Sequence, residues 1–168
     1  MNVKEIRINA QLMCNKSIDK SMCINYINEG IRDIISKNIN AGEVKKRELF
    51  AFNTKWYPIK AKDEINRVLL KLKYIINEQN KRTKMYIKVG DEVMFDLMGR
   101  YTLFYVLLPN KVKSEDDEPK MKECYHDALS AYCAYRERLR FYGADDDSTK
   151  LLYELYNQRI FSTDGGYY

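Results

Sequence analysis

The hydrophobic positions of the chain follow a helical period near both ends and a strand period in the middle. Between residues 18 and 39, isoleucines recur three and four positions apart, which predicts an amphipathic helix. Residues 40–62 show no regular period, but their aromatic side chains indicate a loop that packs down. From 65 to 108 apolar and polar residues alternate, with a short-turn signal at Gly90 and Asp91. This middle segment therefore predicts roughly four antiparallel strands.

The C-terminal third has the pattern of two helices joined by a tight turn. Apolar and tyrosine side chains between residues 124 and 142 fall on one half of a helix. Gly143 suits the left-handed position that often ends a helix. The run Asp145–Asp147 then comes at the start of a second helical pattern, where carboxylates are favoured by the free N–H groups and the helix dipole. We therefore expect a helical hairpin after a polar linker at 111–119.

Together these patterns predict an α+β fold that is mainly helical, in which an N-terminal helix and a C-terminal helical hairpin flank a small antiparallel β insertion. The length of 168 residues fits a single domain, residues 1–168. Its expected parts are an N-terminal helix and aromatic loop, a β insertion, a C-terminal helical hairpin and a tail, at residues 1–55, 56–110, 111–161 and 162–168.

Charge is distributed unevenly along the chain, whose net charge is +5. Residues 1–113 hold 22 basic and 12 acidic side chains, whereas residues 114–168 hold 7 and 12. A basic front and an acidic back predict either attraction between copies, head to tail, or one basic face for an anionic partner.

Catalytic and cofactor motifs are missing from the sequence. It contains no phosphate-binding glycine loop, zinc-protease helix, nucleophile elbow or EF-hand loop. The four cysteines lack close metal-site spacing and are expected to be reduced, small hydrophobic residues. His126 falls on the polar side of its helix, where a solvated histidine is expected. We therefore expect no enzyme activity, no metal and no cofactor.

Membrane insertion and export are also not indicated. No stretch approaches the roughly 20 apolar residues of a membrane helix. The first residues are charged and lack the apolar block of a signal peptide. We expect a non-exported protein without a membrane partner.

Tyrosine is the strongest anomaly, with 14 in the chain. These side chains either form half-buried rims of the protein's own core or belong to a protein–protein interface, where Tyr and Arg are enriched. The apolar arc of the last helix exceeds half its circumference, which favours the interface. The candidate interface residues are Arg136, Tyr142, Tyr153, Tyr156, Arg159, Ile160, Phe161, Tyr167 and Tyr168.

Basic residues cluster in segments that we expect to be loops or turns. A candidate DNA-facing surface comprises Lys45, Lys46, Arg47, Lys81, Arg82 and Lys84. Each cluster alone is typical of a solvated turn, but together they indicate non-specific attraction to phosphates. A small basic nucleic-acid-binding protein is therefore the alternative function. Salt-dependent DNA binding by the isolated monomer would favour it.

The order of these parts is similar to that of a known group of phage proteins. A helix containing "INEGIRDIISK" precedes an aromatic loop with "WYPI", and a strand region ends in "GRYTLFYVLLP". A helix with "YHDALSAYCAYRERLRFYGADDD" and a last helix with "LLYELYNQRI" follow. Over residues 12–161 this arrangement resembles the head–tail connector proteins of tailed bacteriophages, the adaptor or ring proteins below the portal. The abundance of Asn, Ile, Lys and Tyr is similar to that of crAss-like phages.

The resemblance implies a ring of twelve copies in the virion neck that joins the portal to the tail and surrounds the DNA exit channel. It implies assembly in the host bacterial cytoplasm and no enzymatic activity. The last helix and tail would dock on the portal or a neighbouring copy, and the strand region would contact an adjacent ring or line the lumen. The strand region is larger than in all-helical connectors, which leaves the ring layer open.

Overall fold

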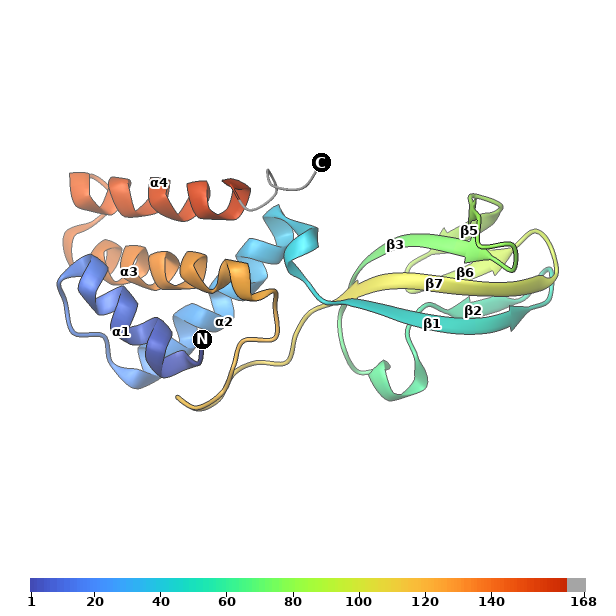
Figure 1. Ribbon diagram of the computed structural model, residues 1–168, viewed down its shortest axis with the longest axis horizontal. Coiled ribbons are helices and arrows are strands. Elements are labelled where there is room, and N and C mark those ends of the chain that lie inside the picture. The colour runs from blue at the N-terminus through green and yellow to red at the C-terminus, as the bar shows by residue number, and fades with distance from the viewer. Residues whose placement is uncertain (163–168) are drawn as a thin grey trace. The chain divides into compact units, whose positions relative to one another are not determined.

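The computed structural model describes residues 1–162 and divides the chain into two compact units (Figure 1). Of the described residues, 1–42 and 109–162 form a helical unit, and Glu43–Leu108 form a strand unit. The fold is α+β, with 44% of residues in four helices and 24% in strands of two antiparallel sheets. The expected mainly helical fold with a small β insertion is therefore wrong.

The helical unit is built around one central helix. Its helices are α1 (Val3–Cys14), α2 (Lys20–Lys37), α3 (His126–Tyr142) and α4 (Asp147–Ser162), with short 3₁₀ turns η1 (Ile39–Ala41) and η3 (Glu123–Tyr125). Helix α3 contacts the other three, and its residues 128–134 are all buried (Figure 1). A helix enclosed on all sides must be apolar or small on all sides, which explains the run "ALSAYCA".

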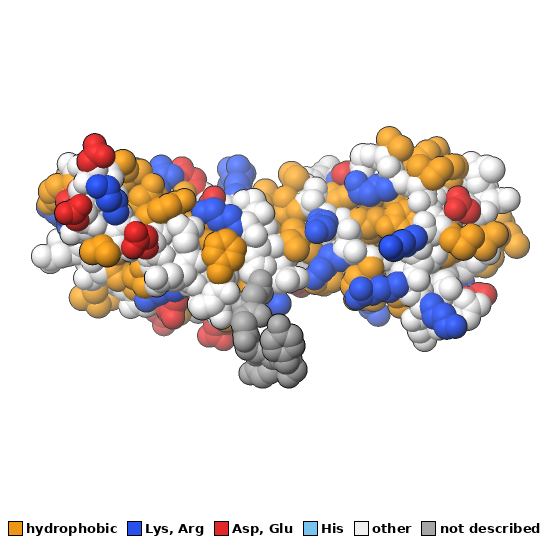
Figure 2. Space-filling view, turned by 90° about the horizontal axis from the view of Figure 1, so that it is seen from above, with side chains coloured by type: hydrophobic (Ala, Val, Ile, Leu, Met, Phe, Trp, Pro, Cys, Tyr) orange, Lys and Arg blue, Asp and Glu red, His pale blue; other side chains and the backbone are white. Residues whose placement is uncertain are grey.

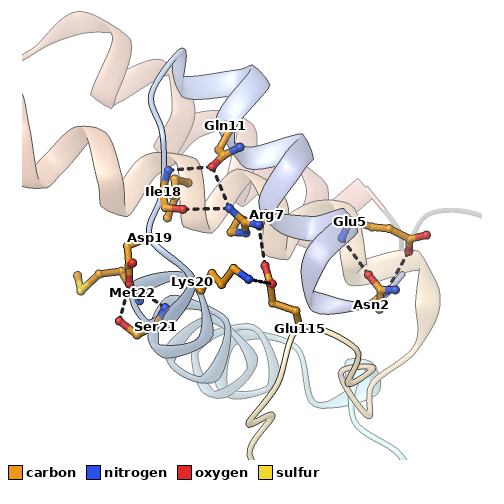
Figure 3. Close-up of polar contacts among 10 residues, drawn as sticks. All are labelled: Asn2, Glu5, Arg7, Gln11, Ile18, Asp19, Lys20, Ser21, Met22 and Glu115. Atoms are coloured by element: carbon orange, nitrogen blue, oxygen red, sulfur yellow. Dashed lines mark hydrogen bonds and ion pairs between the residues drawn. The ribbon is translucent and has the colours of Figure 1, made fainter.

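Helix α1 has no counterpart in the sequence prediction. Its start is a capping box, in which the Asn2 side chain accepts from the Glu5 N–H and the Glu5 carboxylate accepts from the Asn2 N–H, both at 2.9 Å (Figure 3). Its buried face is short, comprising Val3, Ile6, Ala10 and Cys14. This mixed apolar pattern is weaker than the isoleucine repeat of α2, which is why periodicity alone missed the helix.

The linker that returns from the strand unit is tied to the first two helices. The Glu115 carboxylate lies 2.7 Å from the Arg7 guanidinium and 2.7 Å from the Lys20 ammonium (Figure 3). Hydrogen bonding to Lys20 and attraction to Arg7 lower the pKa of Glu115 against the opposing effect of burial. The acidic linker is therefore part of the helical unit's packing.

The turn of the α3–α4 hairpin lies where the sequence predicts, but Gly143, with a ψ of −179°, does not adopt the left-handed helical conformation expected of it. Gly143 follows α3 with a φ of 78°, and its N–H donates to the Leu139 carbonyl at 3.1 Å. Asp146 accepts from the Thr149 N–H at 2.8 Å and from the Thr149 hydroxyl at 2.9 Å. It also pairs with Arg138 at 3.1 Å. The aspartate run therefore starts a helix.

The strand unit consists of two antiparallel sheets. Sheet A has the order β1 (Val44–Ala51), β7 (Gly99–Leu107), β3 (Leu69–Asn77) and β4 (Arg82–Thr83). Sheet B has the order β2 (Trp56–Pro58), β6 (Glu92–Phe95) and β5 (Tyr86–Val89). Strand β1 lies in the segment expected to be a loop, and β2 lies at the start of the expected β insertion, before its first predicted strand. The reason is that the buried side of β1 carries few apolar residues, so its sequence "VKKRELFA" does not alternate clearly.

The core of the strand unit draws side chains from both sheets. Buried residues include Leu103 and Tyr105 of β7, Ile75 of β3, and Val93 and Phe95 of β6. The Tyr105 hydroxyl donates to the Glu64 carboxylate at 2.6 Å and accepts from the Ala61 N–H at 3.2 Å. Burial, and then the Glu64 carboxylate, raise the pKa of Tyr105 to about 12.

Gly30 allows α2 to approach α3 closely. A Cβ atom at this position would lie 2.9 Å from Cδ1 of Tyr132 and 3.0 Å from Cδ2 of Leu129. Alanine normally stabilises a helix interior by up to about 1 kcal/mol over glycine. Overpacking a well-filled core costs about 1–3 kcal/mol. The Gly30→Ala variant should therefore lose about 1 kcal/mol of unfolding free energy, measured by urea denaturation with helical circular dichroism.

The exposed α2 position Ser36 provides the control. Ser36→Ala should change the unfolding free energy by less than about 0.5 kcal/mol. A Gly30→Ala protein that gains the full propensity difference would contradict close packing of the two helices.

Tyr105 should make the strand unit sensitive to alkali. The unfolded tyrosine loses its proton near pH 10, whereas the folded one holds it to about 12. Its stabilising contribution is therefore complete below pH 10 and is lost as the pH rises to about 12. Tyr105→Phe should flatten the fall of stability in this window, followed by the fluorescence of Trp56, the single tryptophan. An unchanged slope would show that Tyr105 is not the responsible group.

Candidate interaction surfaces

Two of the candidate interface residues belong to the core of the helical unit. Tyr156 and Ile160 of α4 are both 0% exposed. The Tyr156 hydroxyl donates to the Asp33 carboxylate of α2. Burial, and then the Asp33 carboxylate, raise the pKa of Tyr156 well above its ordinary value. These two side chains hold α4 in place and are not available to another chain.

Both candidate interface arginines have partners inside the helical unit. Arg136 forms an ion pair with Glu29 at 2.5 Å and donates to the Tyr132 hydroxyl at 3.0 Å. Its guanidinium carbon lies 5.5 Å from the ring centre of Tyr26. Arg159 donates to the Asp127 carbonyl at 2.8 Å. An arginine among aromatic rings is tolerated when its donors are satisfied in this way.

Tyrosines of α3 and α4 form a cluster across the hairpin. The ring centre of Tyr132 lies 5.0 Å from that of Tyr156, and that of Tyr135 lies 5.1 Å from that of Tyr153. The Lys37 ammonium lies 4.8 Å from the ring centre of Tyr156. Much of the tyrosine anomaly is therefore explained by this unit's own packing.

The remaining candidate interface residues differ in accessibility. Tyr142, Tyr153 and Phe161 are exposed by 47%, 42% and 56%. They leave part of the hairpin surface open to contact with another chain. Tyr167 and Tyr168 lie outside the described residues.

A second apolar surface lies on the strand unit, at residues that the sequence interpretation did not choose. The outer face of sheet B carries a row of three side chains across its strands, Trp56 of β2, Met94 of β6 and Ile87 of β5, which we call the apolar row. Trp56 and Ile87 are exposed by 39% and 50%. The sequence could have indicated this surface, because successive strand residues point to opposite faces. If Val93 and Phe95 are buried, Met94 between them must point outward.

The first cluster of predicted DNA-facing residues lies in a strand, so the expectation of a loop is wrong there. Lys45, Lys46 and Arg47 belong to β1, whose alternation points Lys46 away from the other two. Lys45 forms an ion pair with Glu43 at 2.7 Å. Arg47 donates to the carbonyls of Pro58 and Lys60, so it braces the strand unit. Only Lys46 remains on the open face of sheet A.

The second cluster surrounds the short edge strand β4. Lys81 precedes this strand, Arg82 is part of it and Lys84 follows it, and all three are exposed. The Arg82 guanidinium carbon lies 4.4 Å from the ring centre of Tyr74 in β3. This cluster stays accessible to an anionic partner.

Net positive charge belongs to the strand unit. Residues 43–108 hold 14 Lys and Arg against 8 Asp and Glu, a net charge of +6. The rest of the chain holds 15 and 16, a net charge of −1. Figure 2 shows Lys and Arg side chains spread among apolar ones over the strand unit, with few acidic ones. The helical unit contains residues from both the basic N-terminal part and the acidic C-terminal part of the sequence. The change of charge after residue 113 therefore does not separate two parts of the structure.

Among the residues that could serve catalysis, His126 and Cys133 are buried, whereas Cys124 is exposed. His126 is 3% exposed, so the expectation of a solvated histidine is wrong. Its Nε2 lies 3.3 Å from the Pro119 carbonyl oxygen, and burial lowers its pKa. Burial likewise raises the pKa values of Cys14 and Cys133. Residues 1–162 contain no group of three or more His, Cys, Asp or Glu side chains placed to hold a metal ion.

Comparison with protein-family models and with curated protein sequences finds no match to this chain. In the described part of the chain, every helix is too short or too polar to cross a membrane.

The hydroxyl of Tyr156 should matter for stability, whereas that of Tyr153 should not. Tyr156→Phe removes a hydrogen bond to a carboxylate, a class of bond that contributes about 1.5–3 kcal/mol. The exposed Tyr153→Phe should change the unfolding free energy by less than about 0.5 kcal/mol. Urea denaturation of both variants measures the difference. Equal effects would contradict the division of the tyrosines into core and surface.

Proposed function

We propose that this protein is a structural subunit of the head–tail connector of a tailed bacteriophage, forming a ring in the virion neck between portal and tail. The ring surrounds the DNA exit channel and has no enzymatic role. The resemblance of the sequence to connector proteins implies twelve copies. The observation that carries the proposal is the apolar surface that the strand unit leaves open.

The strand unit leaves many large apolar side chains exposed. The strand unit has 66 residues, and its exposed large hydrophobic side chains are Val44, Phe50, Phe52, Trp56, Ile65, Val68, Leu70, Met85, Ile87, Val89, Leu97 and Met98. Scattered exposed apolar residues are ordinary, but contiguous ones mark contact sites. The apolar row supplies that continuity because neighbouring strands place its three side chains together.

Contacts between subunits of a ring would cover such a surface. In a ring, one patch of each subunit contacts a different patch of the next subunit. The apolar row is one such patch, and the exposed side chains of Tyr142, Tyr153 and Phe161, spread along the helical hairpin, offer contacts to a neighbouring copy or the portal. An aromatic and aliphatic patch with a polar surround is typical of the centre of a protein interface.

Charge placed in the apolar row should prevent assembly. The double variant Trp56→Glu/Ile87→Glu should remain folded but stay a monomer of 20.0 kDa. The unchanged protein should form rings of about 240 kDa at twelve copies. The reason is that a buried, unpaired carboxylate in an apolar contact costs several kcal/mol. Mass photometry and negative-stain microscopy measure the result, and circular dichroism checks the fold.

Leu12→Glu on α1 is the matched control, since Leu12 is 77% exposed and belongs to neither patch. It should leave rings intact. Equal loss of rings in both variants would remove the apolar row from the interface. An unchanged protein that stays monomeric and never binds purified portal rings would overturn the connector proposal itself.

A further inference from the structure

The outer face of sheet A is chemically different from that of sheet B. Its central pair is Tyr74 of β3 and Phe104 of β7, which are opposite each other in the strand register. Their ring centres are 4.5 Å apart with an interplanar angle of 25°. The neighbouring core residues Leu103 and Tyr105 point to the other side, so this pair belongs to the outer face.

Three cations surround the aromatic pair. Lys46 of β1 is opposite Phe104, Arg82 of β4 is opposite Ile76, and Lys71 of β3 is opposite Val106. All three side chains are exposed. Lys81 and Lys84 flank β4 and add charge at the same edge of the sheet.

Acidic groups occupy only one end of this face. Glu48 is opposite Thr102 and lies 3.5 Å from Lys46. Glu48 and Glu78 both line a hollow of about 630 Å³ that also contains Arg100. Arg100 and Lys46 therefore each have a carboxylate nearby, whereas Lys71 and Arg82 form no ion pair among the described residues.

The aromatic pair holds the Arg82 side chain in place and does not provide an open ring on which a nucleic-acid base could stack. One face of Tyr74 is covered by Phe104, and the Arg82 guanidinium lies 4.4 Å from the same ring centre. A guanidinium held over a ring keeps its N–H donors directed at its edge, where a phosphate can accept them. Base stacking in single-strand readers needs an open ring face, which Tyr74 lacks.

We propose that the outer face of sheet A binds the phosphate backbone of duplex DNA, through Lys46, Lys71 and Arg82, without reading sequence. From β1 to β4 the cations extend over three strand spacings, about 14 Å. This length corresponds to roughly four phosphates of one DNA strand. Attraction to phosphates dominates non-specific binding and needs no base contact.

This inference goes beyond the proposed connector function and does not depend on it. A ring around a DNA channel can carry such a face on each subunit, and a monomer can carry it equally well. Ring formation and DNA binding are measured separately, and the apolar row that serves assembly contains none of the three cations.

The test is fluorescence anisotropy with a short labelled duplex of mixed sequence over a range of salt concentrations. The triple variant Lys46→Gln/Lys71→Gln/Arg82→Gln removes three phosphate contacts and keeps the aliphatic stems. Its affinity should fall at least about 30-fold at about 50 mM salt, and the slope of log K against log salt should shrink by about 2.7. Circular dichroism and thermal unfolding check that the sheet is intact.

A second triple variant, Lys4→Gln/Lys62→Gln/Lys88→Gln, removes the same charge from exposed positions outside this face. It should retain affinity within about threefold. Equal losses in the two triple variants would show general attraction by net charge and overturn the assignment. Absence of measurable binding by the unchanged protein at low salt would overturn it as well.

The role of Tyr74 is tested by a double-mutant cycle. Tyr74→Leu should weaken duplex binding about as much as Arg82→Gln, and should add little in the Arg82→Gln background, because the ring acts through the guanidinium. Binding of a single-stranded oligonucleotide of the same sequence tests the alternative, in which this face stacks bases. Tighter binding of the single strand, lost on Tyr74→Leu even without Arg82, would replace the backbone site by a base-stacking site.

Discussion

The pairing of β1 with β7 is the constraint on which the two-unit chain depends. The strand unit interrupts the helical unit between Gly42 and Pro109, so the chain must leave and return near one place. The register places Val44 opposite Val106 and continues to the pair Ala51 and Gly99. Because the first and last strands of the insertion are hydrogen-bonded neighbours, the ends of the insertion are held together. Joining distant ends otherwise costs entropy that grows with loop length.

In the core of each unit, a tyrosine hydroxyl forms a hydrogen bond that connects two segments distant in the sequence. Tyr26 donates to the buried Glu137 at 3.0 Å, and Tyr105 donates to Glu64 at 2.6 Å. Burial, and then the carboxylate of Glu137, raise the pKa of Tyr26 to about 12. In each case a large ring fills space while its hydroxyl satisfies a carboxylate from a segment distant in sequence. Phenylalanine would fill the same space but would remove this hydrogen bond and leave each carboxylate only its longer contact to an arginine, which explains tyrosine in place of phenylalanine at these positions.

The sequence predicted those helices and turns that are determined by interactions between residues close together in the chain. The helical hairpin was predictable because Gly143 and Asp146 specify its turn through their own backbone and side-chain bonds. Strand β1 was missed because its own sequence does not alternate clearly. It is stabilised by pairing with β7 and by the hydrogen bond from Arg47 to the Pro58 carbonyl. Tyr156 and Ile160 were misassigned to an interface for a similar reason. Asp33 of α2, more than a hundred residues earlier, accepts a hydrogen bond from Tyr156, and Asn38 just after α2 donates to the Ile160 carbonyl.

The two outer faces of the strand unit follow from the alternation of its strands. On sheet B, burial of Val93 and Phe95 forces Met94 outward between Trp56 and Ile87. On sheet A, burial of Leu103 and Tyr105 forces Phe104 outward toward Tyr74. The same rule therefore creates an apolar face and a cationic face from one core. Since a period of two fixes which side chains share a face, neither surface can change its chemistry by slipping register without exposing the core. A small β unit with such faces can hold a protein neighbour on one side and leave its cations free for a polyanion on the other.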